Sequence, residues 1–264
     1  MNRNKYTACL LLSLISVCSN VAQISAGNHG FTSSKVITKE QDHKEIETWF
    51  AGNKNDGFVR CTLNFKTGHL NVKATSQDKK TVLKEIFING RELWKPYIKS
   101  VSFEGNFFSI GSYYEEDSDK IKKTFENCNK ITSIEILNKV EYINNEAFEG
   151  FDSLISLNVK GCVENICDSA FKDCTQLICV DIKSSVKSIQ NCAFANCRSL
   201  QSINIQGSVD LILGLVFVNC NNLTNINIEG KVKRISNINF AFFGCNSLPL
   251  STKLKLYKQT LTNF

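Results

Sequence analysis

Apolar and polar positions alternate along this chain in a pattern that repeats every 23 residues. A twelve-residue line that begins with Phe recurs in register, starting at Phe125, Phe148, Phe171, Phe194 and Phe217. A shorter copy starts at Phe242, after an insertion of two residues. One unit holds too few large apolar side chains to enclose a core alone, so successive units must stack and share one. The chain is therefore expected to form a solenoid.

Two segments of each unit are expected to form strands, and the first shows the period-two alternation that is typical of a strand. The first directs two apolar residues per turn inward, and these pairs are Ile134/Ile136, Leu157/Val159, Val180/Ile182, Ile203/Ile205 and Ile226/Ile228. Equivalent strands of successive turns should lie parallel and ~4.8 Å apart. The second segment, with the pattern V-x-x-I, predicts a shorter strand on another wall. Stretches such as residues 145–151 are expected to form short helical turns, with the repeated Phe rings as an inner spine.

The pattern changes on the N-terminal side of the repeats. Residues 58–96 are expected to form a β cap, in which residues 61–73 make a hairpin around Thr67-Gly68. A further strand is expected over residues 82–89. Ile98, Val101 and Phe103 occupy the strand positions of an incomplete first repeat. An acidic and aromatic insertion over residues 113–120 predicts a surface loop. At the other end, residues 251–264 are expected to be a C-terminal cap or tail that closes the stack as a strand through Leu254 and Leu256.

The first 26 residues have the pattern of a secretory signal peptide. Arg3 and Lys5 precede a run of ten mainly apolar residues, 8–17, and small residues follow. The run is shorter than the ~20 residues that a membrane-spanning helix needs, and no second long apolar run occurs. A buried N-terminal helix is the alternative. Residues 27–57 show no periodicity and are expected to be a loosely ordered polar leader. The protein is therefore expected to be secreted or held at an extracellular surface.

The repeat motif I-x-x-x-A-F-x-x-C-x-x-L-x-x-I-x-I resembles the leucine-rich repeats of BspA-like surface proteins, over residues 97–250. The resemblance implies an α/β repeat solenoid, a leucine-rich-repeat horseshoe of ~23-residue turns with a parallel β-sheet on its concave face. The strand order before the repeats resembles the N-terminal β-hairpin cap of that family. The resemblance also implies surface exposure and adhesion or ligand binding, and it brings no catalytic residues.

One polar position in each predicted strand points away from the core. These positions form a column of Glu135, Asn158, Asp181, Asn204 and Asn227, and a neighbouring column contains Lys160 and Lys183. Repeat solenoids use their extended concave side for binding, so this face is a candidate ligand surface. A solvated sheet face without a ligand is the alternative.

Half of the ten cysteines that follow the signal segment share one repeat position. They are Cys128, Cys174, Cys197, Cys220 and Cys245. Phe151 replaces Cys in the second turn, which indicates a buried apolar site and therefore a ladder of free thiols. Parallel side chains on neighbouring turns suit a disulfide poorly. Any disulfide should come from the cysteines off this ladder, which are Cys61, Cys162, Cys167, Cys179 and Cys192.

The sequence offers little chemistry for catalysis. The three His residues lie upstream of the repeats, no phosphate-binding Gly-rich loop occurs, and neither a cofactor nor a metal site is expected. The formal net charge is +6, and the basic residues are interspersed with acidic ones. Such a mixed surface does not suit nucleic-acid binding, which needs a one-sided basic stripe. The sequon at Asn222 could carry a glycan.

The favoured interpretation is therefore a non-enzymatic binding module whose partner is a protein, such as a host or matrix protein. Three alternatives stay open. They are an enzyme with its site in the 113–120 loop or in the N-terminal hairpin, a self-assembling structural protein, and an intracellular scaffold if residues 8–17 are not a signal. The oligomeric state is not predicted.

Overall fold

The computed structural model of the chain describes residues 45–75, 81–87, 90–114 and 120–261. All of them belong to one compact unit, His43–Phe264. The expected signal peptide, most of the expected polar leader and residues 115–119 of the expected loop lie outside the described residues.

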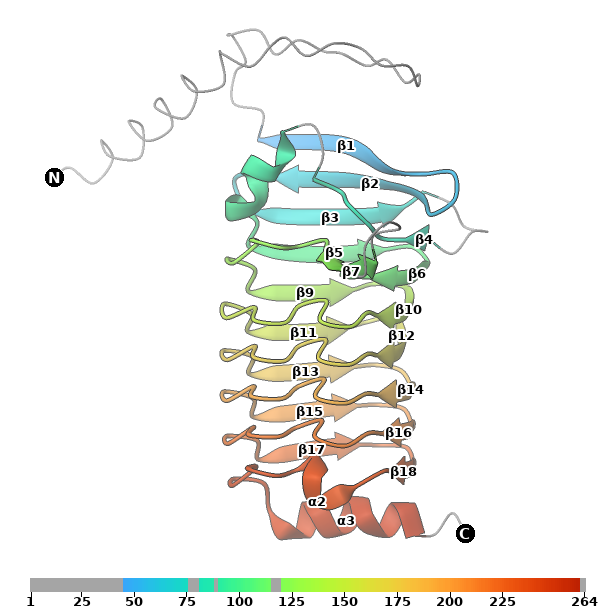
Figure 1. Cartoon of the computed structure of the whole chain (residues 1–264), viewed down its shortest axis with the longest axis vertical. Coiled ribbons are helices and arrows are strands. Elements are labelled where there is room, and N and C mark those ends of the chain that lie inside the picture. The colour runs from blue at the N-terminus through green and yellow to red at the C-terminus, as the bar shows by residue number, and fades with distance from the viewer. Residues whose placement is uncertain (1–44, 76–80, 88–89, 115–119, 262–264) are drawn as a thin grey trace, which may run out of the picture. The chain divides into compact units, whose positions relative to one another are not determined.

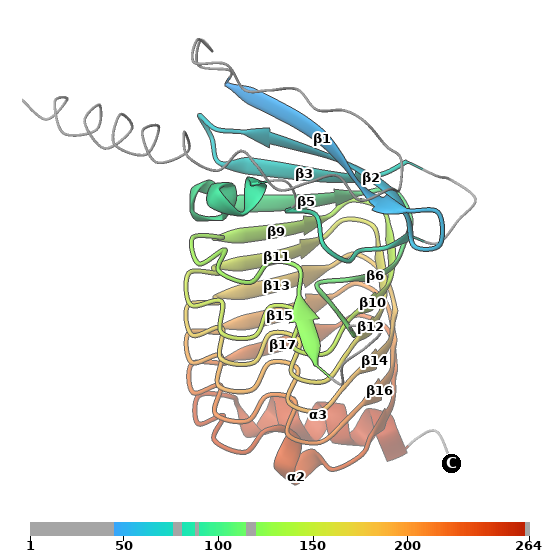
Figure 2. The same ribbon diagram turned by 45° about the horizontal axis from the view of Figure 1, so that its top comes forward.

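Two sheets run along the stack of repeats (Figure 1). Within the described residues, the long sheet has nine strands, in the spatial order β1 (Ile46–Asn53), β2 (Gly57–Asn64), β3 (His69–Ala74), β5 (Ser100–Glu104), β9 (Ser133–Ile136), β11 (Ser156–Val159), β13 (Cys179–Ile182), β15 (Ser202–Ile205) and β17 (Asn225–Ile228). The short sheet has seven, in the order β18 (Val232–Ile235), β16 (Val209–Ile212), β14 (Val186–Ile189), β12 (Cys162–Ile166), β10 (Lys139–Ile143), β6 (Phe107–Ile110) and β4 (Thr81–Val82). Each repeat adds one strand to each sheet, and a third wall of turns closes the coil (Figure 2).

The repeat keeps its register from turn to turn. In the long sheet Leu157 of β11 pairs with Ile134 on one side and with Val180 on the other, in parallel strands. The inward pairs predicted from the alternation are all buried. The predicted parallel sheet is therefore confirmed, and the chain forms a parallel-sheet β-solenoid. The horseshoe curvature stays a prediction.

Where the sequence predicts short helical turns, the third wall consists of hydrogen-bonded turns, and within the described repeats only the last contains a helix, α2 (Ile238–Ala241). In the four middle repeats each turn breaks helical geometry twice with a positive φ, and in the first and last repeats it does so once. In one repeat these residues are Ser169 (φ 56°) and Asp173 (φ 60°). The second of these positions is occupied down the stack by Asn, Asp or Gly, the residues that tolerate left-handed backbone best.

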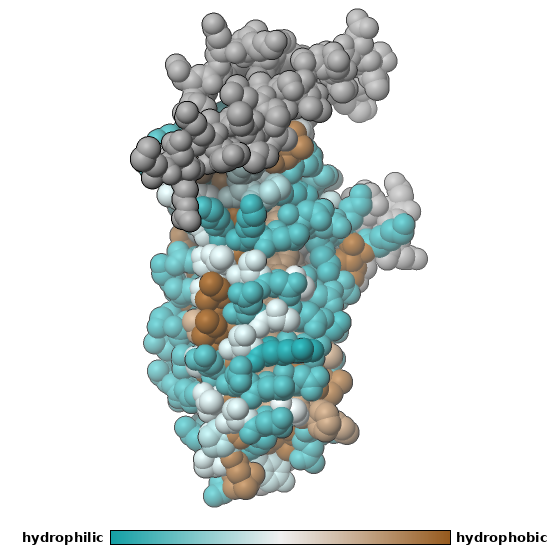
Figure 3. Space-filling view, turned by 90° about the vertical axis from the view of Figure 1, so that its left-hand side faces the viewer, coloured by the Kyte–Doolittle hydropathy of each residue, from teal (hydrophilic) through white to brown (hydrophobic). Residues whose placement is uncertain are grey.

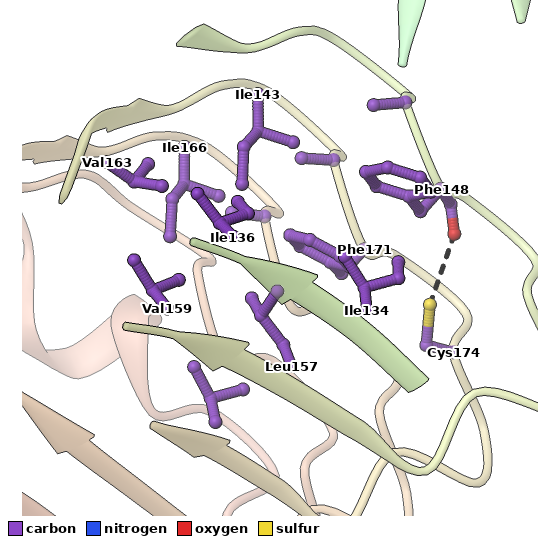
Figure 4. Packing of buried hydrophobic residues seen from close by; sticks show 14 of the residues in the cluster. Ile134, Ile136, Ile143, Phe148, Leu157, Val159, Val163, Ile166, Phe171 and Cys174 are labelled. Carbon is purple, nitrogen blue, oxygen red and sulfur yellow. Dashed lines mark hydrogen bonds between the residues drawn. The ribbon is translucent and has the colours of Figure 1, made fainter. Parts of the chain in front are cut away.

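The core is a continuous column between the three walls. Ile134, Leu157 and Val159 of the long sheet face Val163 and Ile166 of the short sheet and the repeated Phe rings, as Figure 4 shows. From Phe125 to Phe242 neighbouring rings of this Phe spine stack with centroids 5.3–5.9 Å apart. This spacing suits offset stacking, so every turn buries one ring against the next.

The N-terminal strands extend the long sheet past the repeats. β2 and β3 pair antiparallel on either side of Thr67 and Gly68, and β3 then pairs parallel with β5. Gly68 has φ 74°, and a Cβ there would lie 2.6 Å from the Tyr97 carbonyl oxygen, so the turn requires glycine. β1 lies inside the segment expected to be a polar leader, so that boundary was wrong. Its inward residues, Trp49 and Ala51, are buried.

The segment between β3 and β5 is mostly irregular. Only Thr81 and Val82 pair, as β4, so the strand expected over residues 82–89 is wrong in its described part. A 3-10 helix, η2 (Arg91–Tyr97), follows and holds Trp94 against Trp49, with ring centroids 5.4 Å apart. The base of the expected loop is an antiparallel ribbon of β7 (Ser112–Tyr114) and β8 (Ile121–Lys123).

The last element is a helix, α3 (Leu250–Leu261), which lies across the end of the stack (Figure 1). The closing strand expected through Leu254 and Leu256 is therefore wrong. Pro249 precedes the helix and its carbonyl accepts the first helical hydrogen bonds, while Leu, Lys and Gln favour helix in the segment that follows. Leu256 is buried at the junction. Among the described residues, no helix combines the length and the apolarity needed to cross a bilayer.

Candidate binding surface

The outward face of the long sheet carries the predicted polar column. Ser102, Glu135, Asn158, Asp181, Asn204 and Asn227 lie opposite one another in consecutive strands. A second outward column starts at Ser133 and continues through Ser156, Cys179 and Ser202 to Asn225. The strands thus align polar side chains at the spacing of the sheet, ~4.8 Å.

The part of this face on β11, β13, β15 and β17 is here called the open face. It consists of Asn158, Asp181, Asn204 and Asn227 with the flanking residues Lys160 and Lys183. Within the described residues, the side chains of Asn158, Asp181, Asn204, Asn227 and Lys183 make no hydrogen bond or ion pair. Lys160 pairs with Glu135 in the preceding turn, with Nζ 3.0 Å from Oε1. The open face therefore retains most of its hydrogen-bonding capacity.

The same face is saturated where it continues over β3 and β5. The His69 ring lies between two hydroxyls, with Nδ1 2.8 Å from Ser100 Oγ and Nε2 2.9 Å from Ser102 Oγ. Asn71 donates to Ser102 Oγ at 3.0 Å. Lys73 forms an ion pair with Glu104. These six residues are here called the paired face.

Burial lowers the pKa of His69 from its ordinary 6.5, and the nearby Glu135 charge opposes this shift only in part. Neutral His69 can donate to one serine hydroxyl and accept from the other, which suits its position between them. Sequence reasoning did not find this cluster, because it depends on parallel pairing between β3 and β5.

The other two walls are also paired internally. On the short sheet, Glu164 accepts from Lys139 and Lys187, each at 2.7 Å. On the third wall, Glu149 accepts from Lys123 and Lys172, each at 2.9 Å. The lysine hydrogen bonds lower the pKa of Glu164. At Glu149, burial acts to raise the pKa, but the same kind of hydrogen bonds outweighs burial and the pKa is lowered.

Asn and Asp side chains form a hydrogen-bonded ladder on the third wall. Asn219 Nδ2 donates to Asn196 Oδ1 at 2.9 Å, and Asn196 Nδ2 donates to Asp173 Oδ1 at 2.8 Å. Side chains of these types, placed 23 residues apart, can therefore bridge successive turns of this solenoid.

The structure places all five cysteines of the expected thiol ladder in the core, at most 1% exposed. The thiols of Cys174, Cys197, Cys220 and Cys245 donate to the carbonyl oxygen of a Phe in the preceding turn at 3.0–3.1 Å. Figure 4 shows this bond between Cys174 and Phe148. Burial raises the pKa of Cys128 and of Cys174 to about 12.

The cysteines off the ladder differ in exposure. Cys61 and Cys167 are buried, and burial raises their pKa values to about 12 and about 11. Cys162, Cys179 and Cys192 are partly exposed, and all ten cysteines of the described residues are free thiols in this structure. The disulfide pairs considered from sequence stay untested predictions.

Two further predicted features lie away from the open face. Asn222 is exposed in a turn of the third wall, and Thr224 of its sequon donates to the Gln201 carbonyl at 3.1 Å. A pocket of about 440 Å³ beside β8 is lined in part by Lys95, Lys123 and Glu149. Within the described residues, no three His, Cys, Asp or Glu side chains are grouped to hold a metal ion.

These features define a repeat β-solenoid with one unpaired polar sheet face. Residues 120–249 match the BspA type leucine rich repeat region in six copies. The repeat region therefore belongs to the BspA-type leucine-rich-repeat family, as the motif predicted.

Several solved structures are similar to the chain. The leucine-rich-repeat protein of T. pallidum is 18% identical, with 84% of this chain and 96% of that chain covered and a TM-score of 0.36. A leucine-rich cell surface protein of Faecalibacterium prausnitzii is 14% identical, with 76% and 81% covered and a TM-score of 0.24. The pneumococcal vaccine antigen PcpA is 15% identical, with 69% and 48% covered and a TM-score of 0.30. These TM-scores are low, so the family assignment depends on the repeat motif. No curated protein matches the chain.

Proposed function

We propose that this protein is a non-catalytic binding module, secreted or exposed at a cell surface, that binds a protein ligand through its open face. The ligand is of the host or matrix protein type. Membership of the repeat family supports the interaction-module class, since repeat solenoids bind partners along an extended sheet surface. The charged, apolar and small-residue pattern of residues 1–26 supports export.

The unpaired state of Asn158, Asp181, Asn204 and Asn227 carries this proposal. The other faces contain polar clusters that are paired internally, namely the Glu164 and Glu149 ion pairs and the His69 cluster. A hydrogen bond to a ligand contributes most where the protein group has no internal partner to give up. The open face is therefore the wall on which a polar ligand gains most.

The rigidity of the array adds to this advantage. The polar groups belong to strands whose inward neighbours are buried, so little backbone entropy is lost when a ligand binds. Asp181 lies in the middle of the column, and exposed Lys160 and Lys183 flank it. This arrangement suits a ligand that presents amide or hydroxyl groups with charges of both signs, as an ordinary protein surface does.

The direct test measures saturable attachment of the full chain to intact host cells and to immobilised matrix proteins. The test variant combines Asn158→Lys, Asp181→Lys and Asn204→Lys. The matched control makes the same types of replacement at exposed turn positions, with Asn129→Lys, Asp152→Lys and Asn222→Lys. We expect attachment to fall about tenfold or more in the test variant only, as for loss of central interface residues. Equal attachment of both variants, or none by folded wild type, would reject the open face.

Cys179 offers a second readout without mutation. It lies on the outward side of β13, two residues before Asp181, and is partly exposed. A ligand on the open face should slow its alkylation. Cys162 and Cys192, which are also partly exposed, should be alkylated at unchanged rates. Protection of all three thiols alike would indicate general stabilisation and no specific contact.

A further inference from the structure

The C-terminal helix packs on the stack with its smaller apolar side. Leu256 is 2% exposed, whereas Leu250, Leu254 and Tyr257 are 69%, 47% and 44% exposed. Positions i, i+4 and i+7 share one face of an α-helix, so these three side chains form an apolar stripe. Attachment of α3 to the solenoid does not account for this stripe.

Two further apolar side chains are exposed at the same end of the stack. Phe240 and Phe243, in and directly after α2, are 55% and 64% exposed. A groove of about 400 Å³ separates α2 from α3, and its lining consists of Ile238, Asn239, Phe242, Leu250, Lys253, Leu254 and Tyr257. Figure 3 shows hydrophobic atoms among hydrophilic ones at this lower end of the molecule. Exposed apolar side chains gathered in this way are typical of an interaction site.

The same end of the chain is uniformly basic. From residue 230 to residue 264 the sequence contains no Asp or Glu, and it contains six cations: Lys231, Lys233, Arg234, Lys253, Lys255 and Lys258. At 3.6 residues per turn, Lys253 and Lys258 flank the apolar stripe on opposite sides. Lys255 and Lys258 are exposed. This surface, consisting of Phe240, Phe243, Leu250, Leu254 and Tyr257 with Lys253, Lys255 and Lys258, is here called the C-terminal face.

The exposed apolar and basic side chains together indicate which kind of partner the C-terminal face can bind. A second copy docked end to end through the same face would bring its lysines against these lysines. A partner must therefore be anionic and must also receive apolar side chains. A bilayer with anionic lipids has both properties, because its headgroups attract lysines and its acyl region accepts Leu, Phe and Tyr side chains.

We propose that the C-terminal face binds the surface of a membrane that contains anionic phospholipids. α3 lies in the plane of the headgroups, with Leu250, Leu254 and Tyr257 directed into the acyl boundary. Exposed Lys255 and Lys258 lie among the headgroups, while Lys253 Nζ donates to the Cys245 carbonyl at 3.3 Å. This site is separate from the open face, which belongs to the long sheet. Either site can fail its test without affecting the other.

The test is flotation of the full chain with two kinds of vesicle, one of phosphatidylcholine alone and one with about a third phosphatidylserine. The test variant is Leu250→Glu with Leu254→Glu. The matched control is Ile155→Glu with Ile178→Glu. The Ile155 and Ile178 side chains are 41% and 38% exposed and directly precede β11 and β13. All forms carry the same residues 1–44, so a difference between them reports on the C-terminal face.

We expect the wild type and the control to float with the anionic vesicles, and to bind them less at high salt. The affinity of the test variant for the anionic vesicles should be lower than that of the wild type by about tenfold or more. Unfolding curves of the two variants should coincide with that of the wild type, since all four positions are exposed. A Phe243→Trp variant should also shift its emission to the blue on anionic vesicles only, which reports insertion without disrupting the face.

Three results would overturn the proposal. The first is no binding to anionic vesicles, and the second is equal binding by the test variant and the control. The third is a concentration-dependent increase in mass that Leu250→Glu with Leu254→Glu removes, without vesicle binding. That result would assign the face to a second copy of the chain.

Discussion

The paired face and the open face belong to one sheet and share one register, yet they differ in what their polar side chains do. On β3 and β5, His69 and Asn71 bind the hydroxyls of Ser100 and Ser102. From β11 to β17, the equivalent column makes no side-chain hydrogen bond among the described residues. Strand alignment alone therefore does not determine whether neighbouring polar side chains pair.

The third wall sharpens this comparison, because it uses the same residue types at the same spacing. Asn219, Asn196 and Asp173 form a hydrogen-bonded ladder there, whereas Asn204 and Asp181 on the open face do not. The ladder residues occupy turn positions with positive φ near 60°. The open-face residues belong to extended strands, whose side chains stand away from the sheet. The hydrogen bonds of the paired regions link neighbouring turns of the solenoid, whereas the open-face side chains make no such link among the described residues.

The largest expected effect on stability lies beneath all of these faces, in the Phe spine. Phe171→Ala removes a fully buried ring that stacks on Phe148 at 5.3 Å and on Phe194 at 5.4 Å. We expect a loss of about 3–5 kcal/mol in the free energy of unfolding, from lost burial and the cavity that is left. Urea unfolding followed by circular dichroism measures it. A loss below about 1 kcal/mol would contradict a shared core.

The thiol ladder should give the next largest effect. Cys197→Ala removes the donor to the Phe171 carbonyl, 3.1 Å away, and leaves a small cavity. We expect a loss of about 1–2 kcal/mol. Cys179→Ala, on the outward side of β13, serves as the control and should change stability by less than about 0.5 kcal/mol. Equal losses at both positions would show that the ladder hydrogen bond contributes nothing specific.

A smaller effect is expected from the ion pairs of the third wall, and it should depend on pH. The pKa of Glu149 is lowered from 4.5, so the folded state favours its charged form. Its contribution is fully present above pH 4.5 and is lost as the pH falls through the lower folded pKa. Glu149→Gln should cost about 0.5–1 kcal/mol at neutral pH. Unfolding curves of variant and wild type should converge below pH 4.5, and a constant difference would exclude the linkage.

Much of this comparison could be predicted from sequence, because the 23-residue period determines which residues occupy equivalent positions in successive turns. The inward Ile, Leu and Val pairs, the Phe spine and the outward column follow from alternation and register. The pairing state of each outward residue could not be predicted, since it depends on rotamers and on which strands become neighbours. His69 lies 31 and 33 residues from its two serine partners, and no period connects them.

The errors at the two ends have local causes. In β1, apolar residues occupy both sides: Trp49 is buried, while Ile46 and Phe50 are 53% and 64% exposed. The alternation is therefore hidden, and the sequence predicts a polar leader in place of this strand. In α3, Leu254 and Leu256 are two residues apart, which resembles strand spacing. The helix is visible only when Leu250 and Tyr257 are included, and these lie on its exposed side.

The smallest expected effect on stability is at the open face, and it tests the comparison most directly. Asn204→Ala removes a side chain without a hydrogen-bond partner among the described residues, so the free energy of unfolding should change by less than about 0.5 kcal/mol. Asn196→Ala, in the turn that precedes β15 in the same repeat, is the matched change on the third wall. It removes two hydrogen bonds and an Asn at φ 60°, and should cost about 1–2 kcal/mol.

For ligand binding, the two variants should rank in the opposite order from their effects on stability. Asn204→Ala should weaken attachment to cells or matrix proteins, because its amide is available to a partner, whereas Asn196→Ala should leave attachment unchanged while the protein is folded. Measuring both quantities on both variants separates residues that hold the solenoid together from residues that face a ligand. If Asn204→Ala cost as much stability as Asn196→Ala, the open face would be structural, and the proposed ligand would have to bind elsewhere.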